Sequence, residues 1–579
     1  MGVLSPESES CSLALVGSGG AGVITAGQVL LSAAAHAGYF GFMTRSTGPQ
    51  IRGGESAAKL RVGVRPVGCE GDRTDLLVAL DWRHADRFAE ELVLDPDSLV
   101  IADPAEGEPP GWVIASGARR VEVGLGELAR AHDGARRNTV AIGVVAGLLG
   151  LGRYSAAIAL HRLLEGKGDR FVEWALTGLD AGMNAAAVQP QSLRLRPPDR
   201  RRRWLLTGNE AVGLGALRGG VRFCAAYPIT PSTDLQEWLA VHLPMVGGCL
   251  VQAEDELAAA NMCIGASFGG VPALTATSGP GLSLMVEALG LAVATETPLV
   301  VVDIMRGGPS TGIPTRSEQA DLEIALKGRH GDAPLLVLAP NSIGDCLTTT
   351  QWAVFLADAL QCPALVLSDQ LLGHAHAAIP PPPERDWHPQ RQAAAAGLTH
   401  YERFEDTANG ISPMAVPGTP GGEHTATGLT HSVSGRPSSA AAEHRRQLDK
   451  RRRKLDSYDF GDDWADIEGD GEIAMVTWGS TTLAAREALA RLHAEGVEVR
   501  LVSLRLLSPI DSARMAGALA GVRHLLVVEQ NHGAQLLHHL RAHCELPAHT
   551  HSLAEPGPVA LTPGRIAAAL RVLNAEHGA

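Results

Sequence analysis

Short apolar runs alternate with stretches of helix-forming sequence along most of this chain. Residues 12–16, 221–225 and 273–277 are typical runs, each with the length of a strand, and a helix-forming stretch separates each from the next run. Continuous apolar runs are typical of strands that are buried on both faces. Since strands that alternate with helices build parallel sheets covered by helices, the pattern predicts an α/β fold.

This alternation is interrupted twice, which divides the chain into three parts. Proline and arginine are concentrated in residues 189–203, as in a linker, and turn-forming residues replace the alternation over residues 381–466. We therefore expect α/β domains over residues 1–188, 204–380 and 467–579. The connection over residues 381–466 is expected to pack on a partner surface, because ordered loops of that length are rare without such a role.

The charge balance narrows the class of protein. The chain of 579 residues has a formal net charge of −14 at pH 7, which argues against a nucleic-acid partner. The basic runs 200–203 and 450–454 are interpreted as a solvated connector and the surface of an exposed charged helix over residues 444–454. No apolar stretch reaches the ~20 residues of a membrane span, and the N-terminus lacks the pattern of a signal peptide. We expect a cytoplasmic protein with no membrane span.

The cysteines carry no cluster motif. Eight are scattered along the chain, and no pair has the two-residue spacing of an iron–sulfur loop or a zinc ribbon. Most are expected to be buried thiols in a reducing compartment.

Four polar clusters close apolar runs in the second domain, at residues 227–232, 252–254, 277–281 and 306–311. In α/β proteins the carboxyl ends of parallel strands are the usual place for ligands, so one crevice could gather all four clusters. Together they supply hydroxyls, a carboxylate, a guanidinium and glycines that allow close backbone approach. Such a site suits an anionic substrate and a cofactor that needs a proton relay.

These clusters resemble the alpha subunit of the 2-oxoacid:ferredoxin oxidoreductases, the 2-oxoglutarate type most closely. Residues 17–22 and 45–54 resemble the family's gamma domain, here fused ahead of the alpha part, and residues 412–421 also resemble the family pattern. The resemblance covers nearly the whole chain. It implies a gamma-type α/β domain, a thiamine-pyrimidine-binding parallel-sheet domain and a transketolase-C-terminal-like α/β domain.

The resemblance also implies roles for individual residues. Glu254 would be the catalytic carboxyl that meets the aminopyrimidine ring of thiamine, although the sequence alone equally describes an acid at a helix N-terminus. Thr230 and Arg306 would bind the substrate, and a 2-oxoacid carboxylate suits a guanidinium that would otherwise be buried without a partner. The thiamine ring side would be lined by Pro228, Ile229, Ser278 and Gly281.

Gly17, Gly19 and Gly22 fit the pattern G-x-G-x-x-G at the start of a helix. A dinucleotide site would need an acidic residue about 20 positions further on, and residues 40–45 contain none, which argues against an NAD-dependent dehydrogenase. A glycine turn at a helix N-terminus still favours an anion. The resemblance implies a role near coenzyme A, and close packing is the alternative.

The chain lacks a complete metal motif of thiamine enzymes and a cysteine motif for an iron–sulfur cluster, and the resemblance implies that the enzyme uses both groups. Asp470 in Gly469-Asp470-Gly471 is followed by no asparagine before Asn531, so the metal motif of thiamine enzymes is incomplete. His539 and His543 have helical spacing but no third ligand, which favours a packing helix. We therefore expect no metal on this chain: thiamine diphosphate and Mg²⁺ would be held mainly by a beta subunit, which would also carry the iron–sulfur cluster.

The resemblance thus implies one subunit of an enzyme, in an α₂β₂ heterotetramer. The reaction would be oxidative decarboxylation of 2-oxoglutarate with coenzyme A to succinyl-CoA and CO₂, with reduction of ferredoxin. Pyruvate, branched-chain 2-oxoacids and indolepyruvate stay open as substrates. The alternative of another class is a non-catalytic scaffold that binds coenzyme A or a partner.

Overall fold

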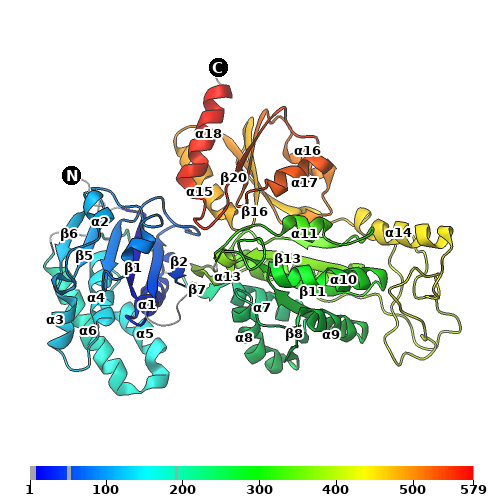
Figure 1. Cartoon of the computed structure of the whole chain (residues 1–579), viewed down its shortest axis with the longest axis horizontal. Coiled ribbons are helices and arrows are strands. Elements are labelled where there is room, and N and C mark those ends of the chain that lie inside the picture. Colours follow the sequence, from blue (N-terminus) through cyan, green and yellow to red (C-terminus); the bar gives the residue numbers. More distant parts are fainter. Residues whose placement is uncertain (1–7, 49–53, 190–192, 200, 314–315, 578–579) are drawn as a thin grey trace. The chain divides into compact units, whose positions relative to one another are not determined.

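The computed structural model describes residues 8–48, 54–189, 193–199, 201–313 and 316–577 (Figure 1). The chain divides into two compact units. The first consists of Met1–Thr207 with His374–Pro381, and the second of Gly208–Gly373 with Pro382–Ala579. No helix of the described residues is long and apolar enough to cross a membrane.

The first unit is built on an eight-stranded sheet in the order β6-β5-β4-β1-β3-β2-β14-β7. Its strands are β1 (Ser10–Ser18), β2 (Phe40–Thr47), β3 (Glu55–Gly63), β4 (Leu76–Ala79), β5 (Leu99–Ala102), β6 (Arg119–Glu122), β7 (Trp204–Thr207) and β14 (His376–Ile379). Its helices are α1 (Val23–Ala37), α2 (Gly111–Ala115), α3 (Leu125–Arg130), α4 (Arg137–Leu149), α5 (Arg153–Leu164) and α6 (Asp169–Ala187).

Helices α4 and α6 pack unusually closely because glycines face each other. A Cβ on Gly143 would lie 2.1 Å from the carbonyl of Leu179, and one on Gly182 would lie 2.0 Å from the carbonyl of Val140. Small residues thus allow the close packing of these two helices. The strand at 204–207 was expected to open the second domain's sheet, and this was wrong. It is the edge strand β7 of the first sheet, because β14 returns to pair antiparallel with it.

The second unit contains a seven-stranded sheet in the order β18-β12-β13-β11-β10-β8-β9, parallel except for β18. Its strands are β8 (Phe223–Ala226), β9 (Cys249–Gln252), β10 (Ala273–Thr277), β11 (Leu299–Met305), β12 (Leu336–Leu338), β13 (Pro363–Asp369) and β18 (Leu506–Ser508). The flanking helices are α7 (Gly208–Arg218), α8 (Thr233–His242), α9 (Glu256–Phe268), α10 (Gly279–Ala294), α11 (Leu322–Lys327), α12 (Ile343–Leu360) and α13 (Gln370–His374).

A five-stranded sheet follows in the same unit, in the order β15-β17-β16-β19-β20. Its strands are β15 (Ala465–Glu468), β16 (Ile473–Trp478), β17 (Val499–Leu504), β19 (His524–Glu529) and β20 (His549–Ala554), with helices α15 (Thr481–Ala494), α16 (Ser512–Ala518), α17 (Gln535–His543) and α18 (Pro563–His577). Strand β18 leaves this region and pairs with β12 of the seven-stranded sheet.

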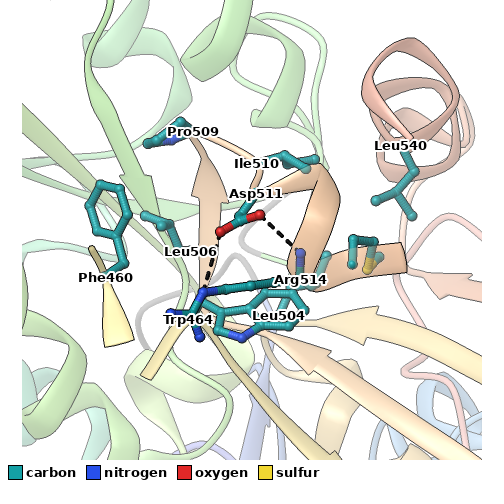
Figure 2. Close-up of a pocket in the computed structure, with 10 residues that line it drawn as sticks. Phe460, Trp464, Leu504, Leu506, Pro509, Ile510, Asp511, Arg514 and Leu540 are labelled. Carbon is teal, nitrogen blue, oxygen red and sulfur yellow. Dashed lines mark hydrogen bonds and ion pairs between the residues drawn. The ribbon is translucent and has the colours of Figure 1, made fainter. Parts of the chain in front are cut away.

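A small pocket lies beside β18 (Figure 2). Mostly apolar side chains line it, and Asp511 and Arg514 form an ion pair of 3.3 Å at its edge. Its volume of about 10 Å³ leaves room for little more than a water molecule. We therefore regard it as a packing gap in the core.

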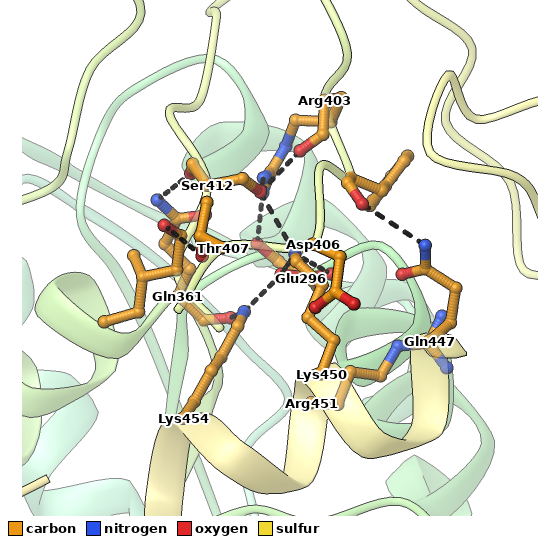
Figure 3. A network of polar contacts seen from close by, with 12 residues as sticks. Glu296, Gln361, Arg403, Asp406, Thr407, Ser412, Gln447, Lys450, Arg451 and Lys454 are labelled. Carbon is orange, nitrogen blue, oxygen red and sulfur yellow. Dashed lines mark hydrogen bonds and ion pairs between the residues drawn. The ribbon is translucent and has the colours of Figure 1, made fainter. Parts of the chain in front are cut away.

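The connection between the two sheets is anchored by α14 (Ala441–Asp456). Lys450 and Lys454 on this helix both bind the carboxylate of Glu296, and Lys450 Nζ lies 2.6 Å from Glu296 Oε1 (Figure 3). Arg403 Nη2 donates to the backbone carbonyl of Glu296 at 2.8 Å.

The interpretation of the run 450–454 as solvated is wrong for two of its residues, because Glu296 supplies a buried counter-charge. Lys450 is 0% exposed and Lys454 is 2% exposed. In the other basic run Arg201 and Arg202 are exposed, Arg203 stacks on the Phe40 ring, and Arg200 lies outside the described residues.

Candidate active site

The four polar clusters lie at one edge of the seven-stranded sheet. Strands β11, β10, β8 and β9 are neighbours in that order and run parallel, so their carboxyl ends share this edge. Each strand is followed directly by one of the clusters predicted from the sequence. The topology therefore brings hydroxyls, carboxylates and a guanidinium from about 85 residues of chain to one place.

Arg306 and Thr230 are in direct contact. Arg306 Nη1 donates to the backbone carbonyl of Thr230 at 2.8 Å, while Arg306 Nε is buried without a hydrogen-bond partner among the described residues. The Thr230 residue is exposed. A guanidinium held on one side by a carbonyl keeps its remaining N–H groups for a ligand, and a carboxylate fits them in two-bond geometry.

The turn that carries Thr230 is held from behind. Ser232 Oγ donates to the carbonyl of Ile229 at 2.9 Å, Asn209 Nδ2 donates to the carbonyl of Pro231 at 3.1 Å, and Gln236 Nε2 donates to the carbonyl of Tyr227 at 3.1 Å. Pro228 is exposed and Ile229 is half-buried. The buried amides fix the backbone of the turn and leave its outer surface open.

The acidic cluster at the start of α9 contains one buried carboxyl. Asp255 caps the helix and accepts a hydrogen bond from Ala258 N at 2.7 Å, and Glu254 is exposed just before it. Glu256 is 6% exposed, and its Oε1 lies 2.7 Å from the position of a Cβ on Gly281. Glycine at 281 thus leaves room for the Glu256 carboxyl.

The sequence analysis gave the catalytic role to Glu254 and none to Glu256. A usable signal was present, because Glu256, Ala259, Ala260 and Cys263 have the spacing of one helix face, and all four are buried. Among the described residues, neither glutamate carboxylate accepts a hydrogen bond. The Glu256 carboxyl is therefore buried and open to an added group.

Ser278 begins α10 at the same edge, as its N-cap residue. It is 0% exposed, and its Oγ has no hydrogen-bond partner among the described residues. Buried polar atoms are rarely left without partners unless a ligand or water supplies them. The unpartnered atoms of Ser278 and Arg306, together with the Glu256 carboxyl, form the donor and acceptor set that a thiamine ring and a 2-oxoacid would need.

Two further carboxyls lie behind Arg306, and sequence reasoning missed both. Asp303 is 0% exposed within β11, and Asp321 precedes α11 and lies against Gly279. Burial, and next the charge of Asp321, raise the pKa of Asp303 well above its usual range. Burial also raises the pKa of Asp321 to about 6. An aspartate inside a valine-rich strand was the available signal for this pair.

The glycine loop of the first unit borders a separate cavity. Gly22 precedes α1 with a φ of 85°, and a Cβ on it would lie 2.3 Å from Asn138 Nδ2. A Cβ on Gly17 would touch Val23 and Leu80 at 3.1 and 3.3 Å, and Gly19 N donates to Gly54 O at 2.6 Å. Gly17 is thus a packing position, while Gly22 lines the cavity.

This cavity has a volume of about 560 Å³. Three cationic side chains and two aromatic ones line it beside the N-terminus of α1: Arg136, Arg137, Lys167, Phe171 and Trp174. Of the neighbouring stretch 45–54, residues 49–53 lie outside the described residues. The lining suits a ligand that combines phosphates with apolar parts.

The remaining candidate ligands have structural surroundings. His539 Nε2 lies 2.8 Å from the carbonyl of Leu507, and burial lowers the pKa of His539 to about 4. Asp470 is exposed and pairs with Arg500 in the turn before β16. Among the described residues, no group of three or more His, Cys, Asp or Glu side chains is placed to hold a metal ion. Six of the eight cysteines are buried, as expected.

Three family models match successive parts of the chain. Residues 12–185 match pyruvate ferredoxin/flavodoxin oxidoreductase, residues 214–450 match the thiamine-diphosphate-binding domain of pyruvate flavodoxin/ferredoxin oxidoreductase, and residues 465–559 match the transketolase C-terminal domain. The predicted fold class, with three α/β domains of these kinds, is confirmed. Fold and site together define a thiamine-dependent oxidoreductase subunit.

Individual proteins match over as much as 90% of the chain. The chain is 37% identical to 2-oxoglutarate synthase subunit KorA of Methanothermobacter marburgensis over 338 residues, 57% of this chain and 88% of that protein. It is 29% identical to 2-oxoacid:ferredoxin oxidoreductase subunit alpha of Saccharolobus solfataricus over 582 residues, 90% of this chain and 91% of that protein.

A solved structure agrees. The 2-oxoglutarate:ferredoxin oxidoreductase from Magnetococcus marinus, with 2-oxoglutarate, coenzyme A and succinyl-CoA bound, matches with 34% identity and a TM-score of 0.90, over 98% of this chain and 100% of that chain. The chain belongs to the family of 2-oxoacid:ferredoxin oxidoreductase alpha subunits, with the gamma-type domain fused ahead of the alpha part. The resemblance predicted from the sequence is confirmed. Because its relatives are named as subunits, members of the family work within multi-subunit enzymes.

Proposed function

We propose that this chain, with a beta subunit, converts 2-oxoglutarate and coenzyme A to succinyl-CoA and CO₂ and passes the electrons to ferredoxin. The contact between Arg306 and Thr230, with the buried Glu256 at the same edge of the sheet, carries the proposal. It places a cation for a carboxylate and an acid for a thiamine ring at one sheet edge. The Magnetococcus marinus relative, whose structure holds 2-oxoglutarate and succinyl-CoA, supports this choice of substrate.

Arg306 and Thr230 bind and orient the substrate. The guanidinium is fixed on the Thr230 carbonyl, and its Nε, which has no partner among the described residues, is left for the 2-oxoacid carboxylate. Thr230 is exposed at the same place, so its hydroxyl can bind the substrate as well. Orientation by two groups at the carboxyl ends of β8 and β11 fixes the keto carbon relative to the cofactor ring.

Thiamine diphosphate, when bound, supplies the electron sink for decarboxylation. Its ring side is held in this proposal by Ser278 and Gly281 at the start of α10 and by Pro228 and Ile229 in the turn after β8. The carboxyl that shares a proton with the pyrimidine nitrogen was predicted to be Glu254, which stays a prediction. The burial of Glu256 against Gly281 favours Glu256 for this role, because a carboxyl that is shielded from water beside the start of α10 is placed to meet a cofactor ring bound there.

The partner completes the site. A beta subunit would hold the diphosphate, Mg²⁺ and the iron–sulfur cluster, since no metal-binding group occurs among the described residues. We propose an α₂β₂ assembly in the cytoplasm.

Coenzyme A is assigned to the cavity of the first unit. Arg136, Arg137 and Lys167 would bind its phosphates together with the N-terminus of α1, and Phe171 and Trp174 would contact its apolar parts. Gly22 lines this cavity, whereas Gly17 packs beneath it.

A reconstitution assay tests the proposal. The chain, purified with its beta partner, is incubated with thiamine diphosphate, Mg²⁺, coenzyme A and a viologen dye, and a panel of 2-oxoacids is compared. We expect turnover with the highest kcat/KM for 2-oxoglutarate and none from this chain alone. A preference for pyruvate, a branched-chain 2-oxoacid or indolepyruvate would correct the substrate. Absence of turnover with every 2-oxoacid, while coenzyme A still binds, would favour the scaffold.

A further inference from the structure

Asp303, which is buried, and Asp321, which is half-buried, form a pair of interacting carboxyls close to Arg306. Asp303 lies opposite Thr277 in the parallel pairing of β10 with β11, three residues before Arg306. Among the described residues, both oxygens of Asp303 and Oδ2 of Asp321 are buried without a hydrogen-bond partner. Two ionised carboxylates repel each other and cannot hydrogen-bond. When one of them carries a proton, it can donate that proton to the other, and these oxygens gain a hydrogen bond.

Glycine makes this arrangement possible. A Cβ on Gly279, the first residue of α10, would lie 2.7 Å from Asp321 Oδ2 and 2.8 Å from Asp321 Oδ1. Any larger residue would push the Asp321 carboxylate away. The pair is therefore built against the same helix start that carries Ser278 and Gly281.

Each carboxyl of the pair has its own set of charged neighbours. Asp303 faces Asp321, and Asp321 faces Asp303, Glu318 and Arg306. Asp303 keeps its proton because it is fully buried, and it can donate that proton in a hydrogen bond to Asp321. Burial raises the pKa of Asp321 to about 6, with Glu318 acting in the same direction and Arg306 against it. Asp321 is thus the member of the pair that titrates near neutral pH.

We propose that Asp303 and Asp321 share one proton and act as a titratable counter-ion that sets the affinity of Arg306 for the 2-oxoacid carboxylate. The inference rests on the proposed function of Arg306. When Asp321 is ionised, its negative charge offsets the guanidinium and repels an incoming carboxylate. When Asp321 is protonated, the full charge of Arg306 acts on the substrate. Asp303 is a positioning residue, since it acts only through Asp321.

The test measures KM and kcat for 2-oxoglutarate in the reconstituted holoenzyme between about pH 5 and 8. In the wild type, we expect KM to rise roughly threefold to tenfold as pH increases through about 6, the effect of one charge several ångströms away, with little change in kcat. Asp321→Asn should lower KM at pH 7.5 by a similar factor and abolish the step. The exposed Glu323→Gln on α11 is the matched control and should behave as the wild type.

Two substitutions of Asp303 separate a positioning role from a structural one. Asp303→Asn keeps a hydrogen-bond donor to Asp321, so the step should stay at or below its wild-type pH. Asp303→Val fits the valine-rich strand but removes the donor, so the step should move to higher pH.

Infrared difference spectra of wild type against Asp303→Asn, without substrate at pH 7, should show one protonated carboxyl group in the wild type.

The outcomes are distinct. A step that persists in Asp321→Asn, a wild-type KM that does not change over this pH range, or a missing carboxyl band would each overturn the proposal while the proposed function stands. If the wild-type holoenzyme turns over no 2-oxoacid, the proposed function fails and the affinity role falls with it. The infrared band would then still decide whether the pair shares a proton.

Discussion

Two groups of charged side chains in the second unit differ in how their charges are paired. Around Glu296, three cations surround one carboxylate. Lys450 and Lys454 lie within hydrogen-bond distance of it, and the charge of Arg403 acts on it from nearby. Around Asp303 and Asp321, two acids face each other, and neither has an ion pair with a cation among the described residues, although the charge of Arg306 acts on Asp321. Unpaired like charges are costly to bury, so they persist where a ligand or a shared proton accounts for them.

The position of the two groups supports this distinction. The Glu296 cluster ties α14 and the long connection to the seven-stranded sheet domain, and Glu296 lies just before β11, at the opposite end of that strand from Arg306. The Asp303 pair lies at the strand ends themselves, behind Arg306. Opposite charges hold the connection in place, while like charges accumulate where substrate and cofactor would bind.

Glu256 belongs by its surroundings to the unpaired class, and its substitution should have the largest effect. Glu256→Gln in the reconstituted holoenzyme should lower kcat by roughly 10²- to 10⁴-fold, the usual contribution of a positioned acid–base group, and leave assembly unchanged. Glu254→Gln, two residues away and exposed, is the matched comparison, and we expect it to retain most activity. Steady-state kinetics and gel filtration on both variants provide the measurement.

The opposite result would restore the assignment made from the sequence. If Glu254→Gln abolishes turnover and Glu256→Gln does not, the pyrimidine carboxyl is Glu254, and burial is a poor guide at this helix start. Equal loss in both variants would assign the effect to the charge of the helix N-terminus and not to a single carboxyl.

Glu296→Gln tests the paired class. Removing the carboxylate leaves Lys450 and Lys454 buried without a counter-charge, which should destabilise the docking of α14 by about 3–5 kcal/mol. Hydrogen exchange of the α14 amides in the holoenzyme measures this loss as faster opening of the helix. Asp456→Asn, in an exposed pair with Arg452 on the same helix, is the control and should change exchange little. Unchanged protection in Glu296→Gln would show that the cluster does not anchor the connection.

The sequence predicted the sheet edge better than the buried charges. Strands such as β11 and β13 were visible because buried parallel strands are continuous apolar runs, and their order along the chain places the polar clusters at one edge. Lys450 was predicted to be solvated because its counter-charge, Glu296, lies 154 positions away in the chain. Asp303 was missed for a similar reason, because its partner Asp321 belongs to a later segment of the chain. Local patterns give the elements, whereas charge pairing depends on contacts between distant segments.

The smallest effect we expect is a pH dependence of the paired cluster. Burial and next the competition with Lys454 lower the pKa of Lys450 to about 7, although Glu296 opposes this shift. The unfolded value is near 10.4, so between these values the unfolded chain binds a proton that the folded chain does not, and stability rises with pH. From pH 7 to 8 this contributes about 1 kcal/mol at most, measured as the opening free energy of α14. Lys450→Met should lose this pH dependence, and if it shows the same rise as the wild type, another group titrates in the cluster.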